Sequence, residues 1–564
     1  MARKINYDNW SKEELIKELR RIKETKYGLV WHRDLPEEKI DILINPDART
    51  PNEMFPNEMA GKPFPILKET KSKEISGDKG KPVNLLIEGD NYHSLAVLNF
   101  THYEAIDLIY IDPPYNTGNN DFIYNDKMVD PEDPFRHSKW LSFMEKRLKL
   151  AKNLLKKTGA IFISIDDNEQ APLRMLCDEI FGEDNFIATI IWQKKYTQSN
   201  DAKYFSATHD FILCYAKQAD KFKIRLLPRT EKQDARYKNS DNDPRGVWMT
   251  QPLHAKSGSD SKYSYTFKNG VIWSPPAGTY PRFSKESLKK ADDENSIWFG
   301  AKGTAVPRLK KYLNEMKQGV IPKTIWLYNE VGSNDDARQE LKELAPENGF
   351  DSPKPTSLVN RIINLASDKN SIILDFFAGS GTTGHAVLKA NKNDKGLRNF
   401  ILCTNNGDEK SEHKIASEIC YPRLKKVIKG YKNAKDENVP GLGGNLKYYT
   451  CDFVEAEPTD KNKRKLVKES TEMLCIRENA FELVQDEGDF KIFKNSDKYL
   501  GIVFYEESIN DFKKAIKKIK GHFNAYVFSL GDDPHEKQFA DVKGKVTLCA
   551  IPEVILKVYR EIFK

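Results

Sequence analysis

Short apolar runs alternate with amphipathic stretches of helical period in two separate parts of this chain. Alternating strands and helices predict an α/β fold with a mostly parallel, doubly wound sheet, because each helix returns the chain to start the next strand. The predicted strands are residues 83–87, 108–111, 159–165, 211–215, 372–374 and 399–403. The predicted helices include residues 11–25, 93–99, 138–155 and 168–181.

The pattern changes between Trp192 and Glu330, where helical periodicity fades and short strands, prolines and aromatic residues dominate. This stretch has 25 Lys and Arg residues against 14 Asp and Glu residues, an excess larger than the net charge of +7 of the whole chain. Basic side chains neutralise phosphates, and aromatic rings stack on bases. The insertion is therefore predicted to bind nucleic acid; the alternative is a loop-rich insertion with a solvated surface.

Length and composition limit the class of protein. The 564 residues exceed what one hydrophobic core holds, so about two to four domains are expected. No apolar run approaches the ~20 residues of a membrane span, and charge begins at Arg3, so neither a membrane span nor a signal peptide is expected. The seven cysteines form no Cys-x-x-Cys pair, which argues against a metal site or a disulfide framework and favours the reducing cytoplasm.

The strand at 108–111 stops at Asp112, which is followed by Pro113, Pro114 and Tyr115. Prolines cannot continue a central strand, so the chain leaves the sheet in a stiff loop at its carboxyl edge, where open α/β sheets bind ligands. The Asp112 carboxylate and the Pro113 carbonyl can accept hydrogen bonds from an exocyclic amine, and Tyr115 offers a ring on which a base can stack. The alternative is a proline-stiffened turn.

A second strand also ends in an acid, and a glycine-rich turn and a helix follow it. A strand, a glycine turn and a helix in this order are typical of nucleotide-like cofactor sites. No Gly-Lys-Ser/Thr follows, so the turn is not a phosphate-cradling loop. The alternative is a glycine cap or tight turn. The residues are Asp375, Phe376, Phe377, Ala378, Gly379, Ser380, Gly381, Thr382 and Thr383.

Together the two motifs resemble the Asp-Pro-Pro-Tyr loop and the Phe-x-Gly-x-Gly loop of DNA amino-methyltransferases. The catalytic loop comes first, the basic insertion second and the cofactor loop third, which is the circularly permuted order of the β-class. Residues 26–31, 88–93, 122–126 and 136–141 further look like the modification subunit of type III restriction–modification systems. The resemblance implies a Rossmann-like, S-adenosyl-L-methionine-dependent core that methylates adenine N6 in a specific site of duplex DNA.

The resemblance also implies roles for individual residues. Catalysis falls to Asp112, Pro113, Pro114 and Tyr115. Cofactor binding falls to Asp90, Asp112, Lys354, Asn405 and the segment from Asp375 to Thr383. An acid at the position of Asp90 touches the cofactor's adenine in the family, although Asp90 also fits a helix N-cap. Asn405 departs from the family, which often has an acid there to hold the ribose.

The predicted domains follow from these motifs. Residues 1–82 form an N-terminal helix and a wrapping arm, and residues 435–564 form a small C-terminal α/β module that is an interaction site or a structural completion. Residues 83–220 and 346–434 form the two parts of the methyltransferase core, with the catalytic and the cofactor loop. Residues 221–345 between them form the inserted target-recognition domain.

The implied partners are double-stranded DNA, a second copy of the chain in a homodimer and a separate helicase–nuclease restriction subunit. The chain has no Walker lysine and no recognisable nuclease motif, so it is not expected to cleave DNA by itself. Two alternatives stay open. One is an N4-cytosine methyltransferase, although such relatives more often have Ser-Pro-Pro-Tyr. The other is a non-catalytic DNA-binding specificity subunit that kept the fold.

Overall fold

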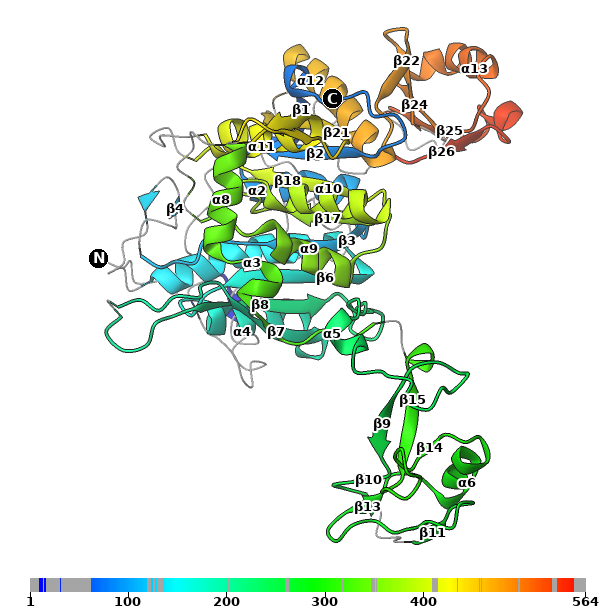
Figure 1. Ribbon diagram of the computed structural model, residues 1–564. Coiled ribbons are helices and arrows are strands. Elements are labelled where there is room, and N and C mark those ends of the chain that lie inside the picture. Colours follow the sequence, from blue (N-terminus) through cyan, green and yellow to red (C-terminus); the bar gives the residue numbers. More distant parts are fainter. Residues whose placement is uncertain are drawn as a thin grey trace. The chain divides into compact units, whose positions relative to one another are not determined.

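A computed structural model gives the fold of the chain (Figure 1). The chain forms two compact units, which we call the core unit (Met1–Ile224 with Thr324–Lys564) and the inserted unit (Arg225–Lys323). The predicted helix at 11–25 lies mostly outside the described residues. The structure describes residues 10–13, 15–16, 31, 62–118, 123–124, 127–128, 135–200, 202–258, 263–316, 319–345, 350, 352–407, 414–433, 435–455, 457, 459–495, 498–529 and 535–551.

The core unit is built on a ten-stranded sheet that is mostly parallel, which confirms the predicted fold class. All neighbours from β21 to β6 pair in parallel, and so do β7 and β16. In spatial order the strands are β1 (Phe64–Glu69), β21 (Asn445–Val454), β2 (Val83–Glu88), β18 (Asn399–Thr404), β17 (Ile372–Asp375), β3 (Ile106–Ile111), β6 (Leu155–Ile165), β8 (His209–Ala216), β7 (Phe186–Gln193) and β16 (Ile325–Trp326).

The predicted strand at 211–215 departs from the parallel pattern. It is β8, which runs antiparallel to both β6 and β7. The connection from β7 to β8 contains no helix, so these two strands form a hairpin, with Gln193 opposite His209. A hairpin reverses the chain direction, whereas only a crossover helix preserves it.

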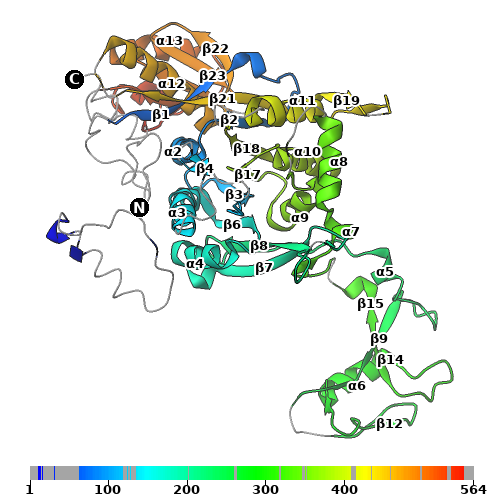
Figure 2. The ribbon, with the colours of Figure 1, turned by 90° about the vertical axis from the view of Figure 1, so that its left-hand side faces the viewer.

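Helices cover both faces of the sheet (Figure 2). One group comprises α2 (Asn91–Thr101), α3 (Arg136–Leu154), α4 (Gln170–Phe181) and α12 (Asp460–Glu478). The other comprises α8 (Asn334–Leu344), α9 (Thr356–Ala366), α10 (Thr382–Asp394) and α11 (Tyr421–Lys429). The central strands are therefore buried on both faces, and this explains why β3 reads as an almost continuous apolar run rather than an alternating one.

The C-terminal part contains a five-stranded sheet with the helix α13 (Ile509–Lys517). Its strands are β22 (Glu482–Asp486), β23 (Phe490–Lys494), β24 (Tyr499–Val503), β25 (Phe523–Val527) and β26 (Val546–Leu548). No helix in the described part of the chain has the apolar length needed to cross a membrane.

Four domain boundaries differ from the sequence prediction. The main sheet takes up β21, beyond the predicted end of the core at 434, because β21 pairs with β2. It also takes up the edge strand β1, from within the predicted wrapping arm, because β1 pairs with β21. The inserted unit spans Arg225–Lys323 rather than 221–345. Helix α8 lies outside it because this helix packs against α11 of the core unit.

The inserted unit has little regular structure and a small apolar core. Within Arg225–Lys323 the sequence has 19 Lys and Arg residues against 10 Asp and Glu residues. Its largest described sheet joins β14 (Ile297–Trp298), β15 (Arg308–Tyr312) and β9 (Trp248–Pro252). The other described elements are β10 (His254–Ala255), β11 (Tyr265–Thr266), β12 (Ile272–Trp273), β13 (Tyr280–Pro281), α5 (Glu231–Asp234) and α6 (Lys285–Asp293).

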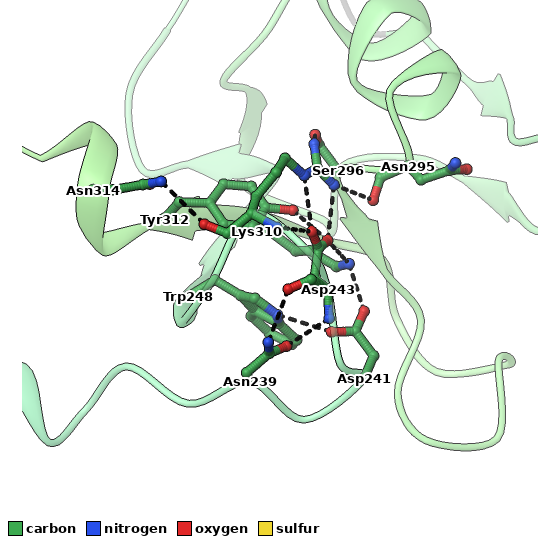
Figure 3. A network of polar contacts seen from close by, with 10 residues as sticks. Asn239, Asp241, Asp243, Trp248, Asn295, Ser296, Lys310, Tyr312 and Asn314 are labelled. Carbon is green, nitrogen blue, oxygen red and sulfur yellow. Dashed lines mark hydrogen bonds and ion pairs between the residues drawn. The ribbon is translucent and has the colours of Figure 1, made fainter.

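A polar network around the buried carboxylate of Asp243 joins the segments of this unit (Figure 3). Asp243 accepts hydrogen bonds from Arg245 Nε at 2.9 Å, from Lys310 Nζ at 2.8 Å and from the Tyr312 hydroxyl at 2.7 Å. Lys310 also pairs with Asp241, and the Arg245 guanidinium lies 4.4 Å from the Tyr312 ring centre. The bond from Arg245, followed by those from Lys310 and Tyr312, holds the pKa of Asp243 far below its usual range.

Replacement of Asp243 by alanine should destabilise the inserted unit, because Lys310 and Tyr312 would lose a shared buried acceptor. Breaking a buried ion pair costs on the order of 3 kcal/mol. Because the pKa of Asp243 is lowered on folding, its contribution should be present above the unfolded pKa near 3.8 and lost as the pH falls below it. Hydrogen exchange of β9 and β15 in the full chain, measured by mass spectrometry, should report faster opening.

The matched control is Asp293→Ala, which removes an exposed ion pair with Lys268 in the same unit. Exposed pairs contribute only about 0–1 kcal/mol, so exchange should change little. Equal effects of the two substitutions would contradict a central role for Asp243.

Candidate active site

The predicted site residues meet at one edge of the main sheet. Strands β2, β18, β17, β3 and β6 run parallel, so their carboxyl ends lie along the same edge. Asp90 follows β2, Asn405 follows β18, Asp375 ends β17 and Asp112 follows β3. The two sequence motifs become neighbours because β17 pairs with β3, with Leu374 opposite Ile109.

The loop after β3 is held by partners from helix α3 and from the segment before α9. Trp140 of α3 donates its indole N–H to the Pro114 carbonyl at 2.7 Å, which fixes the loop directly before Tyr115. Asp112 accepts a hydrogen bond on Oδ2 from Lys354 Nζ at 2.7 Å. Its other oxygen, Oδ1, is buried and meets no hydrogen-bond donor within the described residues. Asp112 therefore offers one anchored oxygen and one available acceptor.

Lys354 links the catalytic loop to the segment before α9. Its ammonium lies 2.7 Å from Asp112, 4.9 Å from the Tyr115 ring centre and 5.9 Å from the Trp192 ring centre. The Tyr115 hydroxyl is buried and lies near Asp112, although no residue that the structure describes meets it with the geometry of an ordinary hydrogen bond. Burial, followed by the charge of Asp112, raises the pKa of Tyr115 well above its usual value. The phenol therefore stays neutral.

A buried carboxylate that the sequence analysis missed supports the same loop. Glu169 accepts hydrogen bonds on Oε1 from Asn116 Nδ2 at 2.5 Å and pairs with His137 Nδ1 at 2.6 Å. Asn116 directly follows Tyr115 and has a φ of 55°, a left-handed conformation that asparagine tolerates better than most residues. The only sequence signal was the position of Asn116 beside the motif, since Glu169 lies on another element.

The glycine loop closes over the end of β17. Asp375 accepts a hydrogen bond from the Phe377 amide at 3.0 Å on Oδ1 and one from the Thr383 hydroxyl on Oδ2. Gly381 has a φ of 80° and caps the start of α10. A Cβ on Gly381 would lie 2.9 Å from Cys420 Sγ, so this glycine is required for packing against the protein itself.

The fully buried Arg423 of α11 anchors the side of this loop. Its NH1 donates to Ser380 Oγ at 3.0 Å and to Thr382 Oγ1 at 2.8 Å, and its NH2 donates to Glu340 at 3.2 Å. Phe376, Ala378, Ser380, Thr382 and Thr383 are buried, whereas Phe377 and Gly379 are partly exposed. No local pattern in the sequence identified Arg423 as a partner of the loop.

Asp90 caps helix α2 and also faces Arg147. Its Oδ1 accepts a hydrogen bond from the Tyr92 amide at 2.7 Å, and Arg147 NH2 lies 3.2 Å away. The next residue, Asn91, donates to the Phe376 carbonyl at 2.8 Å. The capping role proposed from sequence is therefore confirmed, and this helix start lies beside the glycine loop.

Asn405 lies at the surface, with its side-chain oxygen accepting the Gly407 amide at 3.2 Å. The neighbouring Asn406 is bound more firmly: it donates to Glu88 at 2.6 Å and accepts the Ser417 amide at 3.1 Å. Of these two asparagines, Asn405 is the one whose side chain faces outward at this edge.

The comparisons with known proteins agree with this geometry. A family model for DNA methylases of the N6/N4 type matches residues 106–419, more than half of the chain. The chain belongs to this family. The StyLTI Mod subunit of Salmonella typhimurium is 37% identical over 381 residues, or 61% of this chain and 57% of the relative. The EcoPI Mod subunit of Escherichia phage P1 is 31% identical over 471 residues, or 71% of each chain.

These relatives place the DNA methylase within the group of type III Mod subunits, as the sequence resemblance implied. The EcoP15I Mod subunit of Escherichia coli is 30% identical over 400 residues. The matches span 57%, 71% and 61% of the lengths of the three relatives.

Asp375 should make the stability of this DNA methylase depend on pH near neutrality. Burial raises the pKa of Asp375 from 3.8 to about 7, and only neutral donors oppose the rise. A raised folded-state pKa contributes stability that is complete below pH 3.8 and lost as the pH rises through about 7. The unfolding temperature should therefore fall more between pH 5 and pH 8 for the wild type than for Asp375→Asn.

The control is the exposed Asp167→Asn, which should keep the wild-type pH profile. Parallel profiles for the wild type and Asp375→Asn would show that Asp375 is ionised throughout this range.

Proposed function

We propose that this chain transfers the methyl group of S-adenosyl-L-methionine to N6 of adenine in duplex DNA. The observation that carries the proposal is the Asp112 carboxylate, with one oxygen fixed by Lys354 and the other buried as an available acceptor. It stands in a proline-stiffened loop at the carboxyl edge of the sheet, in a chain that belongs to the DNA methylases. The Mod-subunit relatives favour adenine over cytosine as the target base.

The residues at this edge fit the cofactor. S-adenosyl-L-methionine is a sulfonium cation with an amino-acid end and an adenosine end, and it supplies an electrophilic methyl group. Asp90, Asp112 and Asp375 give the edge three acids, while Lys354 supplies a cation near them. In the proposal, the glycine loop from Asp375 to Thr383 and Lys354 hold the methionine end. Asp90 and Asn405 hold the adenosine end.

The protein's part in the reaction is to bind and orient the base. An exocyclic adenine amine is a weak nucleophile because its lone pair is delocalised into the ring. Acceptance of its two protons by Asp112 Oδ1 and the Pro113 carbonyl would favour a pyramidal nitrogen with an exposed lone pair. Such catalysis consists of positioning and electrostatic stabilisation in a site that is already organised. Lys354, Trp140 and the Asn116–Glu169 pair supply that organisation.

We further propose that the chain acts as the modification and specificity subunit of a type III restriction–modification system. The relatives' Mod designation supports this assignment, and the basic inserted unit is the candidate for target recognition. The same proposal includes assembly as a homodimer and pairing with a separate helicase–nuclease subunit. Sequencing DNA from cells with and without this gene, with detection of modified bases, tests the reaction and reveals the target site.

Replacement of Asp112 by alanine should reduce methylation of the target duplex by about a hundredfold or more, since both acceptor functions of the carboxylate are lost. The cofactor should still bind in calorimetry, because most of its proposed contacts lie elsewhere. Asp167→Ala, an exposed acid after the neighbouring strand β6, controls for a general change of charge. A near-normal methylation rate for Asp112→Ala would refute the assignment.

Substitutions of Tyr115 should separate the ring from its hydroxyl. The hydroxyl has no hydrogen-bond partner among the described residues, so Tyr115→Phe should keep most of the activity. Tyr115→Ala should slow methylation roughly 5- to 150-fold, the range that corresponds to losing about 1–3 kcal/mol of base stacking. Single-turnover rates on the target duplex measure both. If Tyr115→Phe were as slow as Tyr115→Ala, the hydroxyl would have to contact the substrate.

A further inference from the structure

The hairpin that connects β7 and β8 leaves the sheet beside the candidate active site. Strand β7 ends at Gln193 opposite His209 of β8, and Phe211 of β8 lies opposite Ile165 at the end of β6. The connecting residues 194–208 therefore emerge at the same edge as Asp112. We call this segment the edge loop; in Figure 1 it extends, in teal, beyond the ends of β7 and β8.

The base of the edge loop is fixed to the site. The Lys194 amide donates to the Thr208 carbonyl at 2.9 Å, and the Lys194 ammonium lies 2.6 Å from the buried Asp210. Trp192, two residues before the loop, lies 5.9 Å from the ammonium of Lys354, the residue that holds Asp112. The loop therefore begins two residues after Trp192, whose ring lies near the lysine that holds Asp112.

The tip of the edge loop exposes the aromatic side chains of two consecutive residues to solvent. Tyr204 is 81% exposed and Phe205 is 96% exposed, the largest values among the exposed large apolar side chains of the described residues. The tip is nevertheless organised, because the Ser199 amide donates to Ser206 Oγ at 2.8 Å. Two consecutive aromatic side chains that are this exposed indicate a surface that binds another molecule.

The charge of the edge loop indicates a polyanion as its partner. Residues 194–208 contain three lysines against a single acid, Asp201. Because Lys194 pairs with the buried Asp210, the loop's basic charge comes from Lys195 and Lys203. The Lys203 ammonium lies 5.2 Å from the Tyr204 ring centre, so a cation accompanies the rings at the tip. Lysines that flank exposed rings suit a duplex, where phosphates lie outside and base faces become available between steps.

We propose that Tyr204 and Phe205 act as a wedge that enters duplex DNA at the target adenine and fills the space that the extruded base leaves. This inference rests on the proposed function. A base must leave the stack before its amine can reach a methyl donor at the sheet edge, at a cost of unpairing and unstacking. An aromatic ring inserted into the duplex replaces part of the lost stacking. Tyr115 would receive the extruded base while the edge loop supports the duplex.

The test compares the double variant Tyr204→Ala/Phe205→Ala with wild type on a duplex that carries the target site found by sequencing modified bases. The matched control is Leu483→Ala/Tyr505→Ala, which removes two exposed large side chains from the C-terminal part of the chain, one in β22 and one after β24. Methylation is measured on a fully paired duplex and on a duplex with a mismatch at the target adenine. Fluorescence of 2-aminopurine at the target position reports base extrusion, and sedimentation reports the oligomeric state.

The wedge variant should methylate the paired duplex about tenfold or more slowly than wild type. It should give less 2-aminopurine fluorescence, and it should recover most of its rate on the mismatched duplex, where extrusion costs less. The control variant should match wild type. An unchanged rate on paired DNA, or an equal loss on paired and mismatched DNA, would overturn the wedge.

Two other outcomes would also overturn it. Weaker DNA binding with an unchanged rate of the bound complex would make the edge loop a docking surface only. A changed oligomeric state would make it a contact between copies of this chain. If wild type methylates neither duplex but the chain binds DNA, the proposed function fails first, and the two failures are distinguishable.

Discussion

The parallel pairing of β17 with β3 is the constraint on which the candidate site depends. It places Ile373 opposite Leu108 and Leu374 opposite Ile109, so that two strands far apart in sequence end side by side. An acid directly follows β3, and another acid ends β17. The chain then leaves the sheet in both places, through prolines after β3 and through glycines after β17. A shift in the register of this pairing would move Asp112 away from Asp375. The apolar faces that set the register therefore also set the relative position of the two carboxylates.

Two carboxylates at this edge have opposite environments, and the difference divides their roles. Asp112 faces the ammonium of Lys354, which holds one of its oxygens in place. Asp375 is buried among neutral donors, and its pKa rises to about 7. Adjacent acids with different environments often have different tasks in one site. In the proposed reaction Asp112 contacts the amine, whereas Asp375 fixes the glycine loop through Phe377 and Thr383.

The sequence predicts the elements that carry a local signal, and it misses those defined by distant partners. Two loops can be predicted from local sequence, the one from Asp112 to Tyr115 and the one from Asp375 to Thr383. Proline restricts the backbone and glycine permits unusual conformations, and both effects are visible within a single segment. Arg423 and Glu169 carry no such signal, since each matters only through a loop that the fold brings to it. For the same reason the pairing of β21 with β2 and of β1 with β21, and hence two domain boundaries, could not be read from composition.

The motif alone does not show why position 381 needs a residue without a side chain, because a bound ligand and a neighbouring protein group would exclude a Cβ in the same way. The structure places Cys420 Sγ 2.9 Å from where that Cβ would lie, so a protein neighbour alone already disfavours a side chain at this position. A larger residue there would therefore disturb the packing of α11 as well as the loop. Loss of cofactor binding in such a variant would not by itself distinguish a lost contact from a displaced helix.

The antiparallel insertion of β8 has a consequence for the site that a fully parallel sheet would lack. A parallel β8 would need a crossover that starts at the carboxyl edge of β7 and returns to the opposite edge. Because β8 is antiparallel, the chain leaves β7 and enters β8 at the same edge, and the whole connection stays beside Asp112. The same reversal that departs from the predicted pattern therefore supplies the site with its exposed aromatic loop.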